Sequence, residues 1–234
     1  MRAPLWIVDI SLGLVLAAGR PAAGQGVTSV GPFTGGLSED FDTLGFPFGS
    51  AHSQMTIFGG FGTVRKLTEG SIKYEFDSNL GGDQVNNRSD PAMIGQLAIA
   101  EWSFATPVSR FGGYWENNSR FDDARVDFYD ANGVLFDTET ALVPKAAQAW
   151  TWNGWESEVP IGKVVVTGND AGFLNGFIWY DDMEVVAAPV PEPSVVLLAG
   201  VAGYALLGVQ LRRHRALPLT VADTVDGSRV GEAG

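Results

Sequence analysis

Three tryptophans stand close together in the chain, at Trp150, Trp152 and Trp155. Flat indole rings suit the apolar faces of pyranose sugars, because they bury area with little loss of conformational entropy. If this segment is a strand, Trp150 and Trp152 share one face, whereas Gly154 turns the chain and leaves Trp155 at a loop end. We therefore expect Trp150 and Trp152 to fill the core and Trp155 to face a ligand. The alternative is that all three indoles are structural.

A fourth tryptophan, Trp115, and two arginines, Arg88 and Arg120, occur in or beside stretches rich in asparagine and serine. Asparagine and serine side chains can bind sugar hydroxyls, and the planar guanidinium of arginine fixes the orientation of a bound group. We expect Trp115, Arg88 and Arg120 to join Trp155 in a ligand-binding surface. The alternative is that these loops serve turn geometry and solvent exposure.

Five carboxylates lie near the two ends of the central part of the chain, at Glu39, Asp40, Asp42, Asp181 and Asp182. If the first and last strands lie side by side, these oxygens come together as ligands of the kind that Ca²⁺ prefers. No D-x-D-x-D-G loop is present. A structural Ca²⁺ is thus the one candidate cofactor, and solvated acidic strand ends are the alternative.

Catalytic groups are few. The chain has no cysteine, which excludes thiol catalysis, disulfides and cysteine-ligated metals, and His52 is the only histidine before residue 190. No serine lies in a G-x-S-x-G turn, so a serine triad is unsupported. We therefore expect that the protein is not an enzyme. A glycan-cleaving hydrolase of β-sandwich fold is kept as an alternative, because a glycosidase needs only two carboxylates, for which the candidates are Glu101, Glu116, Glu156 and Glu158.

The net charge of the chain limits the classes of partner that it is expected to bind. Fifteen Lys and Arg stand against 27 Asp and Glu, a formal charge of −12, and residues 26–189 account for 9 of the basic and 22 of the acidic side chains. The acidity therefore belongs to this central part. It disfavours nucleic acid and anionic membrane surfaces as partners.

Short apolar runs that alternate with polar residues predict strands in residues 26–189, for example at 72–76 and 126–128. The segment Asp130–Gly133 predicts a hairpin, because its Asn-Gly pair accepts positive φ. No amphipathic helix of three turns is evident before residue 189. We expect an all-β domain over 26–189, an antiparallel β-sandwich of jelly-roll type, with a β-barrel as the runner-up.

The N-terminus has the pattern of a secretory signal. An apolar run from Leu5 to Ala18 follows a basic start and is succeeded by small residues, so residues 1–24 are predicted to form a signal peptide. Asp9 interrupts the apolar run. The alternatives are an exposed amphipathic helix and a misplaced start codon.

The C-terminal part carries an uncharged apolar stretch over residues 195–211, followed directly by a basic cluster. Seventeen residues make a helix of about 25 Å, enough for a thin bilayer, with the arginines on the cytoplasmic side. A single transmembrane helix is therefore predicted. It places the central domain outside the inner membrane.

Residues 190–215 combine a Pro-Glu-Pro motif at Pro191, Glu192 and Pro193 with this apolar stretch and the arginines. The arrangement resembles the PEP-CTERM sorting signal, also known as the ice-binding protein C-terminal domain. The resemblance implies export, recognition of the motif by an exosortase-type membrane protease, transient anchoring in the inner membrane and release at the surface of an exopolysaccharide-producing bacterium. Family members usually end after the arginines, whereas here a polar tail continues over 216–234.

The central domain resembles, diffusely, the jelly-roll and carbohydrate-binding-like domains that often precede such a tail. The stretches concerned are 39–42, 110–115, 125–136 and 180–185. The resemblance implies a binding module without naming its ligand. We therefore expect an exported surface or matrix protein that binds polysaccharide through its β-sandwich. A hydrolase and a purely structural matrix protein are the alternatives.

Overall fold

The computed structural model describes residues 26–78, 85–86, 88–89, 91–117, 122–144, 149–169 and 177–189. The chain divides between Ala188 and Pro189, and every described residue except Pro189 belongs to the first unit. The predicted signal peptide (1–24), sorting signal (190–215) with its helix (195–211) and polar tail (216–234) lie outside the described residues. Within the described residues, no helix is long and apolar enough to cross a membrane.

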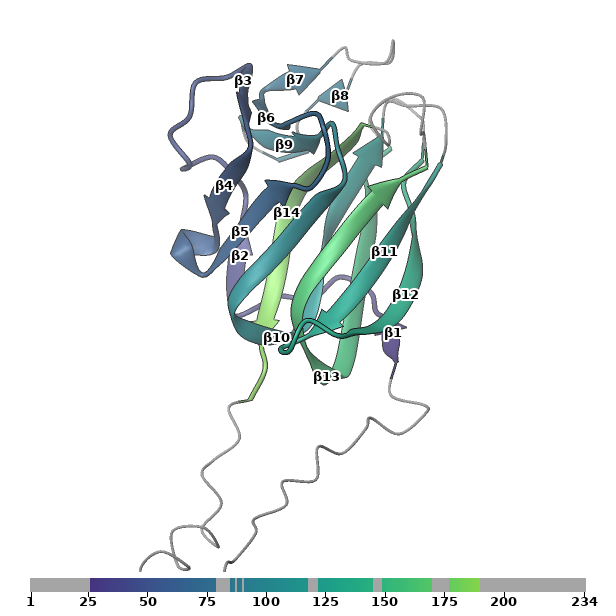
Figure 1. Ribbon diagram of the computed structural model, residues 1–234. Coiled ribbons are helices and arrows are strands. Elements are labelled where there is room, and N and C mark those ends of the chain that lie inside the picture. The colour runs from purple at the N-terminus through teal and green to yellow at the C-terminus, as the bar shows by residue number, and fades with distance from the viewer. Residues whose placement is uncertain are drawn as a thin grey trace, which may run out of the picture. The chain divides into compact units, whose positions relative to one another are not determined.

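Strands make up almost all of the regular structure in this part of the chain (Figure 1). The single helical element there is a 3₁₀ turn, η1 (Phe58–Gly60). The shorter strands are β1 (Val27–Ser29), β2 (Leu37–Glu39), β3 (Ser50–His52), β4 (Gln54–Ile57), β5 (Gly62–Lys66), β6 (Ile72–Glu75), β7 (Asp77–Ser78), β8 (Val85–Asn86) and β9 (Met93–Gln96). The longer ones are β10 (Ala100–Asn117), β11 (Asp123–Asp130), β12 (Leu135–Leu142), β13 (Thr151–Gly168) and β14 (Ile178–Ala187).

Strand β11 shows how the sequence pattern produces the fold. Ala124, Val126 and Phe128 are buried, as the period of two in a strand requires for one face. The predicted hairpin to β12 is confirmed, and Gly133 takes the positive φ of 77° there. Asp130 holds the turn, because its carboxylate accepts the backbone N–H groups of Asn132 and Val134 at 2.8 Å.

The long strands β10 and β13 pair with each other along most of their length, yet their outer neighbours change midway (Figure 1). Residues 100–104 of β10 pair with β5, whereas residues 108–117 pair with β14. Residues 161–168 of β13 pair with β11, whereas 155–157 pair with β1. The ladder between β10 and β13 is irregular from Ser103 to Arg110, and such bulges let strands bend from one layer into another.

Two layers result, which we name by their strands. Layer A contains β4, β5, the first part of β10, the last part of β13, β11 and β12. Layer B contains the remaining parts of β10 and β13 with β1, β2, β14, β9, β6 and β3. Aromatic rings join the layers: Trp102 of layer A packs edge-on against Tyr180 of layer B, with ring centroids 5.0 Å apart. Both are fully buried.

The two outer faces differ. A segment between β1 and β2 lies over the outer face of layer B: the carbonyl of Val30 accepts the indole N–H of Trp152, Phe33 packs against that indole, and the N–H of Gly35 is bonded to Glu184. Layer A has no such cover among the described residues. The side chains of Arg65 and Arg125 on its outer face are 50% and 59% exposed.

The prediction of an all-β antiparallel fold is confirmed, since every strand pair in the described residues is antiparallel. The main sheet runs in the order β12-β11-β13-β10-β14-β9-β6-β3, and its ends are not paired with each other. The two facing layers therefore agree with a sandwich and not with a closed barrel.

Candidate functional site

The outer face of layer A carries a row of side chains that crosses five strands and is polar except at Val165. Register pairs Arg65 on β5 with Glu101 on β10, Glu101 with Val165 on β13, Val165 with Asp127 on β11, and Asp127 with Thr138 on β12. Because cross-strand partners project to the same side of a sheet, these side chains are neighbours on one surface.

Glu101 is the carboxylate of this row that binds two cations. Its carboxylate accepts hydrogen bonds from Arg65 Nε at 2.7 Å, Ser103 Oγ at 3.1 Å and Lys163 Nζ at 3.3 Å, and the residue is only 5% exposed. Burial by itself raises the pKa of this carboxyl, but the three hydrogen bonds and the Lys163 charge outweigh it and hold the pKa below its usual range. Glu101 is therefore ionised at neutral pH and fixes both cations.

A second charged pair lies beside the first. The guanidinium of Arg125 bonds to Asp127 Oδ1 at 2.9 Å, and Thr138 Oγ1 donates to the same oxygen at 2.7 Å. One row further along, the ammonium of Lys163 lies over the ring of Tyr129, 4.4 Å from its centroid. The polar side chains of this face are thus held in place by one another.

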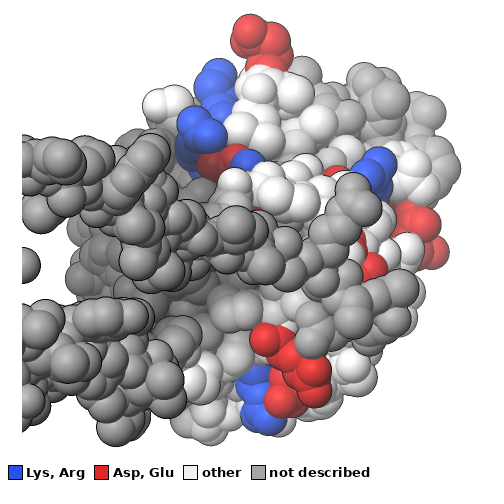
Figure 2. All heavy atoms as spheres, turned by 60° about the horizontal axis from the view of Figure 1, so that its bottom comes forward, with Lys and Arg blue, Asp and Glu red and all other residues white. Residues whose placement is uncertain are grey.

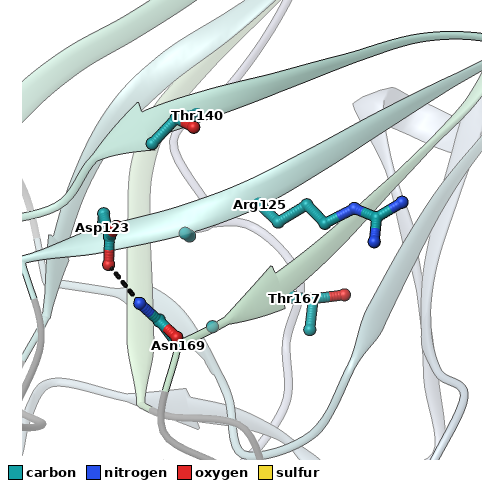
Figure 3. Close-up of a pocket in the computed structure, with 7 residues that line it drawn as sticks. Asp123, Arg125, Thr140, Thr167 and Asn169 are labelled. Carbon is teal, nitrogen blue, oxygen red and sulfur yellow. Dashed lines mark hydrogen bonds between the residues drawn. The ribbon is translucent and has the colours of Figure 1, made fainter.

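At one end of the face is a pocket of about 270 Å³. Figure 3 shows Arg125 of β11 between Thr140 of β12 and Thr167 of β13, and the amide of Asn169 bonded to Asp123 at 2.9 Å. Ala124 and Gly168 complete the lining. Hydroxyl, amide and carboxylate groups therefore line one small volume, in which both donors and acceptors are available, whereas the Arg125 guanidinium extends away from Asp123 and Asn169 and bonds to Asp127.

The prediction that Trp155 and Trp115 face a ligand is wrong. Trp155 is 3% exposed and Trp115 is fully buried. Gly154 does not turn the chain: it lies inside β13 opposite Gly112, so Trp155 points into the core as alternation demands. Trp150 and Trp152, expected in the core, are half-buried instead.

Trp152 lies over the two glycines of the outer face of layer B. A Cβ added at Gly154 would be 2.5 Å from Trp152 Nε1, and one added at Gly112 would be 2.9 Å from Trp152 Cζ2. The indole also packs against Tyr114 and Phe33. The contacts of the Trp152 indole with Tyr114 and Phe33 are therefore made within the protein itself.

Of the two arginines predicted to bind ligand, Arg88 lies in the described part of the chain and contacts other side chains of the domain. Arg88 forms an ion pair with Asp182, and its guanidinium lies over the Tyr114 ring, 3.4 Å from the centroid. Arg120 lies outside the described residues.

The acidic strand ends do lie side by side, because β2 pairs with β14 through Met183 and Glu39. Their carboxylates, however, accept backbone N–H groups: Glu39 those of Phe41 and Phe58, Asp42 that of Ala92, and Asp181 those of Arg88, Ser89 and Asp182. In the described part of the chain, no three acidic or histidine side chains are grouped to hold a metal ion. The calcium prediction for Glu39, Asp40, Asp42, Asp181 and Asp182 thus has no ligand cluster there.

Burial changes the acidity of two of these carboxyls. It raises the pKa of Glu39, although the N–H groups of Phe58 and Phe41 oppose the change. It raises the pKa of Asp181 to about 7, again against hydrogen bonds from backbone N–H groups. Their role in the structure is to tie loops to strands.

Comparison with known proteins gives only distant matches. No family model and no curated protein matches the chain, so the PEP-CTERM resemblance of 190–215 stays a prediction. A DUF4465 family protein from Bacteroides caccae is similar over 65% of this chain and 99% of its own, at 11% identity and a TM-score of 0.43. TmCBM61, solved in complex with β-1,4-galactotriose, covers 64% and 99% at 13% identity and 0.37. The CBM22-1 xylan-binding domain from Paenibacillus barcinonensis covers 68% and 100% at 13% identity and 0.34. The function proposed below rests on the side chains of this chain.

Proposed function

We propose that this protein binds polysaccharide on the outer face of layer A. The observation that carries the proposal is the pocket at Arg125, Thr140 and Thr167, together with the row of paired side chains that continues it across the sheet. Sugar hydroxyls donate and accept hydrogen bonds, and this face offers both kinds of group. The donors and acceptors already hold one another, so binding orders few side chains.

The dimensions of the face favour a chain of sugars over a single one. Side chains of β11 point outward at every second residue from Asp123 to Tyr129, a distance of about 20 Å at 3.3 Å per residue. The pocket lies at one end of this strip and the Lys163–Tyr129 contact at the other. An extended polymer can thus follow the strands.

The outer face of layer B is already covered by part of the chain, which favours layer A as the binding surface. Residues 30–35 already occupy the surface around Trp152, and Arg110 there pairs with Glu156 at 2.8 Å beside Phe33. A ligand on layer B would have to displace part of the chain. Layer A, in the part of the chain described, needs no displacement.

The proposal is for binding without cleavage. A glycosidase needs one carboxyl whose pKa is raised so that it can act as a general acid. On the proposed face the pKa of Glu101 is lowered, and Asp127 is held by Arg125 and Thr138. The other three candidates lie elsewhere: Glu156 pairs with Arg110, Glu116 is fully buried, and Glu158 is exposed on β13 outside layer A.

The proposal also includes export. Its support is the sequence pattern of residues 1–24 and 190–215, in which Pro191, Glu192 and Pro193 resemble the motif read by an exosortase. In this account the domain is anchored transiently in the inner membrane and then functions at the cell surface, in the outer membrane or in the extracellular matrix, bound to exopolysaccharide.

Native affinity electrophoresis of the full-length protein tests the binding proposal, with galactan, xylan and dextran as neutral probes in the gel. The wild type should be retarded by at least one probe. Arg125→Ala should weaken that retardation by about tenfold, the value of one hydrogen bond to a charged group. Arg110→Ala is the matched control, because Arg110 also pairs with a carboxylate, that of Glu156, but lies on layer B. No retardation in any gel would favour the structural matrix protein, and shortened glycan products would favour the hydrolase.

A further inference from the structure

The cations on the outer face of layer A are all neutralised by carboxylates of the same face. Arg65 and Lys163 share Glu101, and Arg125 pairs with Asp127. With Asp123 at the pocket, the described residues of this face include three basic and three acidic groups. Figure 2 shows, on the side in view, blue side chains next to red ones and no broad area of one colour.

We propose that Glu101 is a specificity-determining residue, which restricts this face to uncharged polysaccharide by neutralising Arg65 and Lys163. The inference rests on the proposed function, and it names the ligand class of the same site. It follows from where Glu101 lies: on β10, between β5 with Arg65 and β13 with Lys163, and almost completely buried.

An acidic polysaccharide would have to compete with Glu101. A uronic acid carboxylate could reach Arg65 or Lys163 only by replacing hydrogen bonds of 2.7 and 3.3 Å that are already charge-assisted. Displaced from them, Glu101 would be left as a buried charge with no cation beside it, which is strongly unfavourable. The protein's charge of −12 further opposes the approach of a polyanion.

An uncharged sugar meets no such competition. An arginine has five N–H donors, so its pairing with one carboxylate does not exhaust them, and Asp123 and the threonines supply acceptors. Hydroxyl groups can therefore bind while every ion pair of the face stays formed. The same pairs that exclude a polyanion hold the donors in position for a neutral chain.

The decisive variant is Glu101→Gln, measured in the full-length protein against the neutral probes and against polygalacturonate. The substitution frees Arg65 and Lys163 of their counter-charge with little change in volume. We expect the wild type to be retarded by a neutral probe and not by polygalacturonate, and Glu101→Gln to gain affinity for polygalacturonate by about tenfold or more. That gain should weaken as NaCl is added, because exposed charges are screened.

Glu158→Gln is the matched control. Glu158 is exposed on β13 in the stretch outside layer A, so this change removes one negative charge without freeing a cation of the face. If Glu158→Gln gains polygalacturonate binding as strongly as Glu101→Gln, net charge is responsible and the assignment to Glu101 is wrong. Should Glu101→Gln fail to fold, as a melting curve would show, Asp127→Asn replaces it, because it frees Arg125 in the same way.

The possible outcomes distinguish a failure of the role proposed for Glu101 from a failure of polysaccharide binding. A wild type that binds polygalacturonate as well as a neutral probe contradicts the role of Glu101 and leaves polysaccharide binding intact. The same holds if Glu101→Gln folds and gains nothing, or, where it does not fold, if Asp127→Asn gains nothing. A wild type retarded by none of the probes contradicts the proposed function itself.

Discussion

The indole of Trp155 packs edge-on against the ring of Phe128, with centroids 5.4 Å apart and the ring planes at 63°. Phe128 belongs to β11 in layer A, and Trp155 lies in the part of β13 that belongs to layer B. The contact therefore joins the two layers through the centre of the core. Trp155 therefore stabilises the fold and does not face a ligand.

Trp155→Ala should lower the free energy of unfolding by about 3–5 kcal/mol, because it leaves a large cavity between the layers. Trp152→Ala is the control on the same strand. Its indole is half-buried on the outer face, so we expect a clearly smaller loss. Chemical denaturation of both variants measures the difference, and an equal or larger loss for Trp152→Ala would contradict the placement of these rings.

Gly154→Ala should destabilise the domain by about 1–3 kcal/mol, as overpacking does. The new methyl group would meet the Trp152 indole at 2.5–3.0 Å and force it off the sheet. Gly31→Ala is the control, since a Cβ there has nothing within 4 Å and its φ is not positive. Thermal melting compares the two. A Gly154→Ala variant as stable as Gly31→Ala would show that the indole does not lie over this glycine.

Gly133→Ala should cost about 1–2 kcal/mol of stability for a different reason. Gly133 has open space around it but a φ of 77°, where residues with a Cβ are strained. Gly36→Ala, also in open space and without a positive φ, should change little. Denaturant titration gives both values, and a neutral Gly133→Ala would argue against the turn that links β11 to β12.

The stability of the domain should fall as the pH rises from about 4 to about 7. Burial raises the pKa of Asp181 from 3.8 to about 7, so in this range the folded protein holds a proton that the unfolded chain has lost. The contribution of Asp181 to the free energy of unfolding is fully present below 3.8, its pKa in the unfolded chain. It is lost as the pH rises through about 7, its pKa in the folded protein. Its upper limit is about 4 kcal/mol.

Asp181→Asn should remove that pH dependence, since an amide does not titrate. His52→Gln is the control and should leave the slope in place. Urea unfolding at pH 5, 6, 7 and 8 measures the slope. A wild type whose stability rises steadily over this interval would show that Asp181 is ionised without cost.

Local patterns in the sequence were sufficient for much of the fold. The strands around Ile72–Glu75 and Val126–Phe128, and the hairpin at Asn132-Gly133, follow from alternation and turn chemistry within a few residues. The placement of Trp155 did not follow from local patterns, because it depends on whether the preceding Gly154 lies in a turn or in a strand. The sequence does not distinguish the two until the strand partner of Gly154 is known. That partner is Gly112, 42 positions away and without a side chain.

The candidate surface could be predicted only in part. Alternation in β11 puts Asp123, Arg125, Asp127 and Tyr129 on the face opposite Val126 and Phe128, and this could have been read from the sequence. The meeting of Arg65, Glu101 and Lys163 could not, because it depends on the order and register of three strands that are distant in the chain. The sequence identifies Glu101 only as one of four candidate carboxylates for the hydrolase alternative, and the structure shows it as the partner of two cations.

The most direct measurement of the central claim is a map of the bound ligand on the protein. Backbone amide shifts would be recorded by NMR while an oligosaccharide of the retained neutral probe is added to the full-length protein. The account predicts shifts concentrated on the outer face of layer A, at residues 123–129, 138–140 and 163–169, with little change at 110–115 and 152–156. Shifts concentrated at 110–115 and 152–156, or none at saturating ligand, would contradict it.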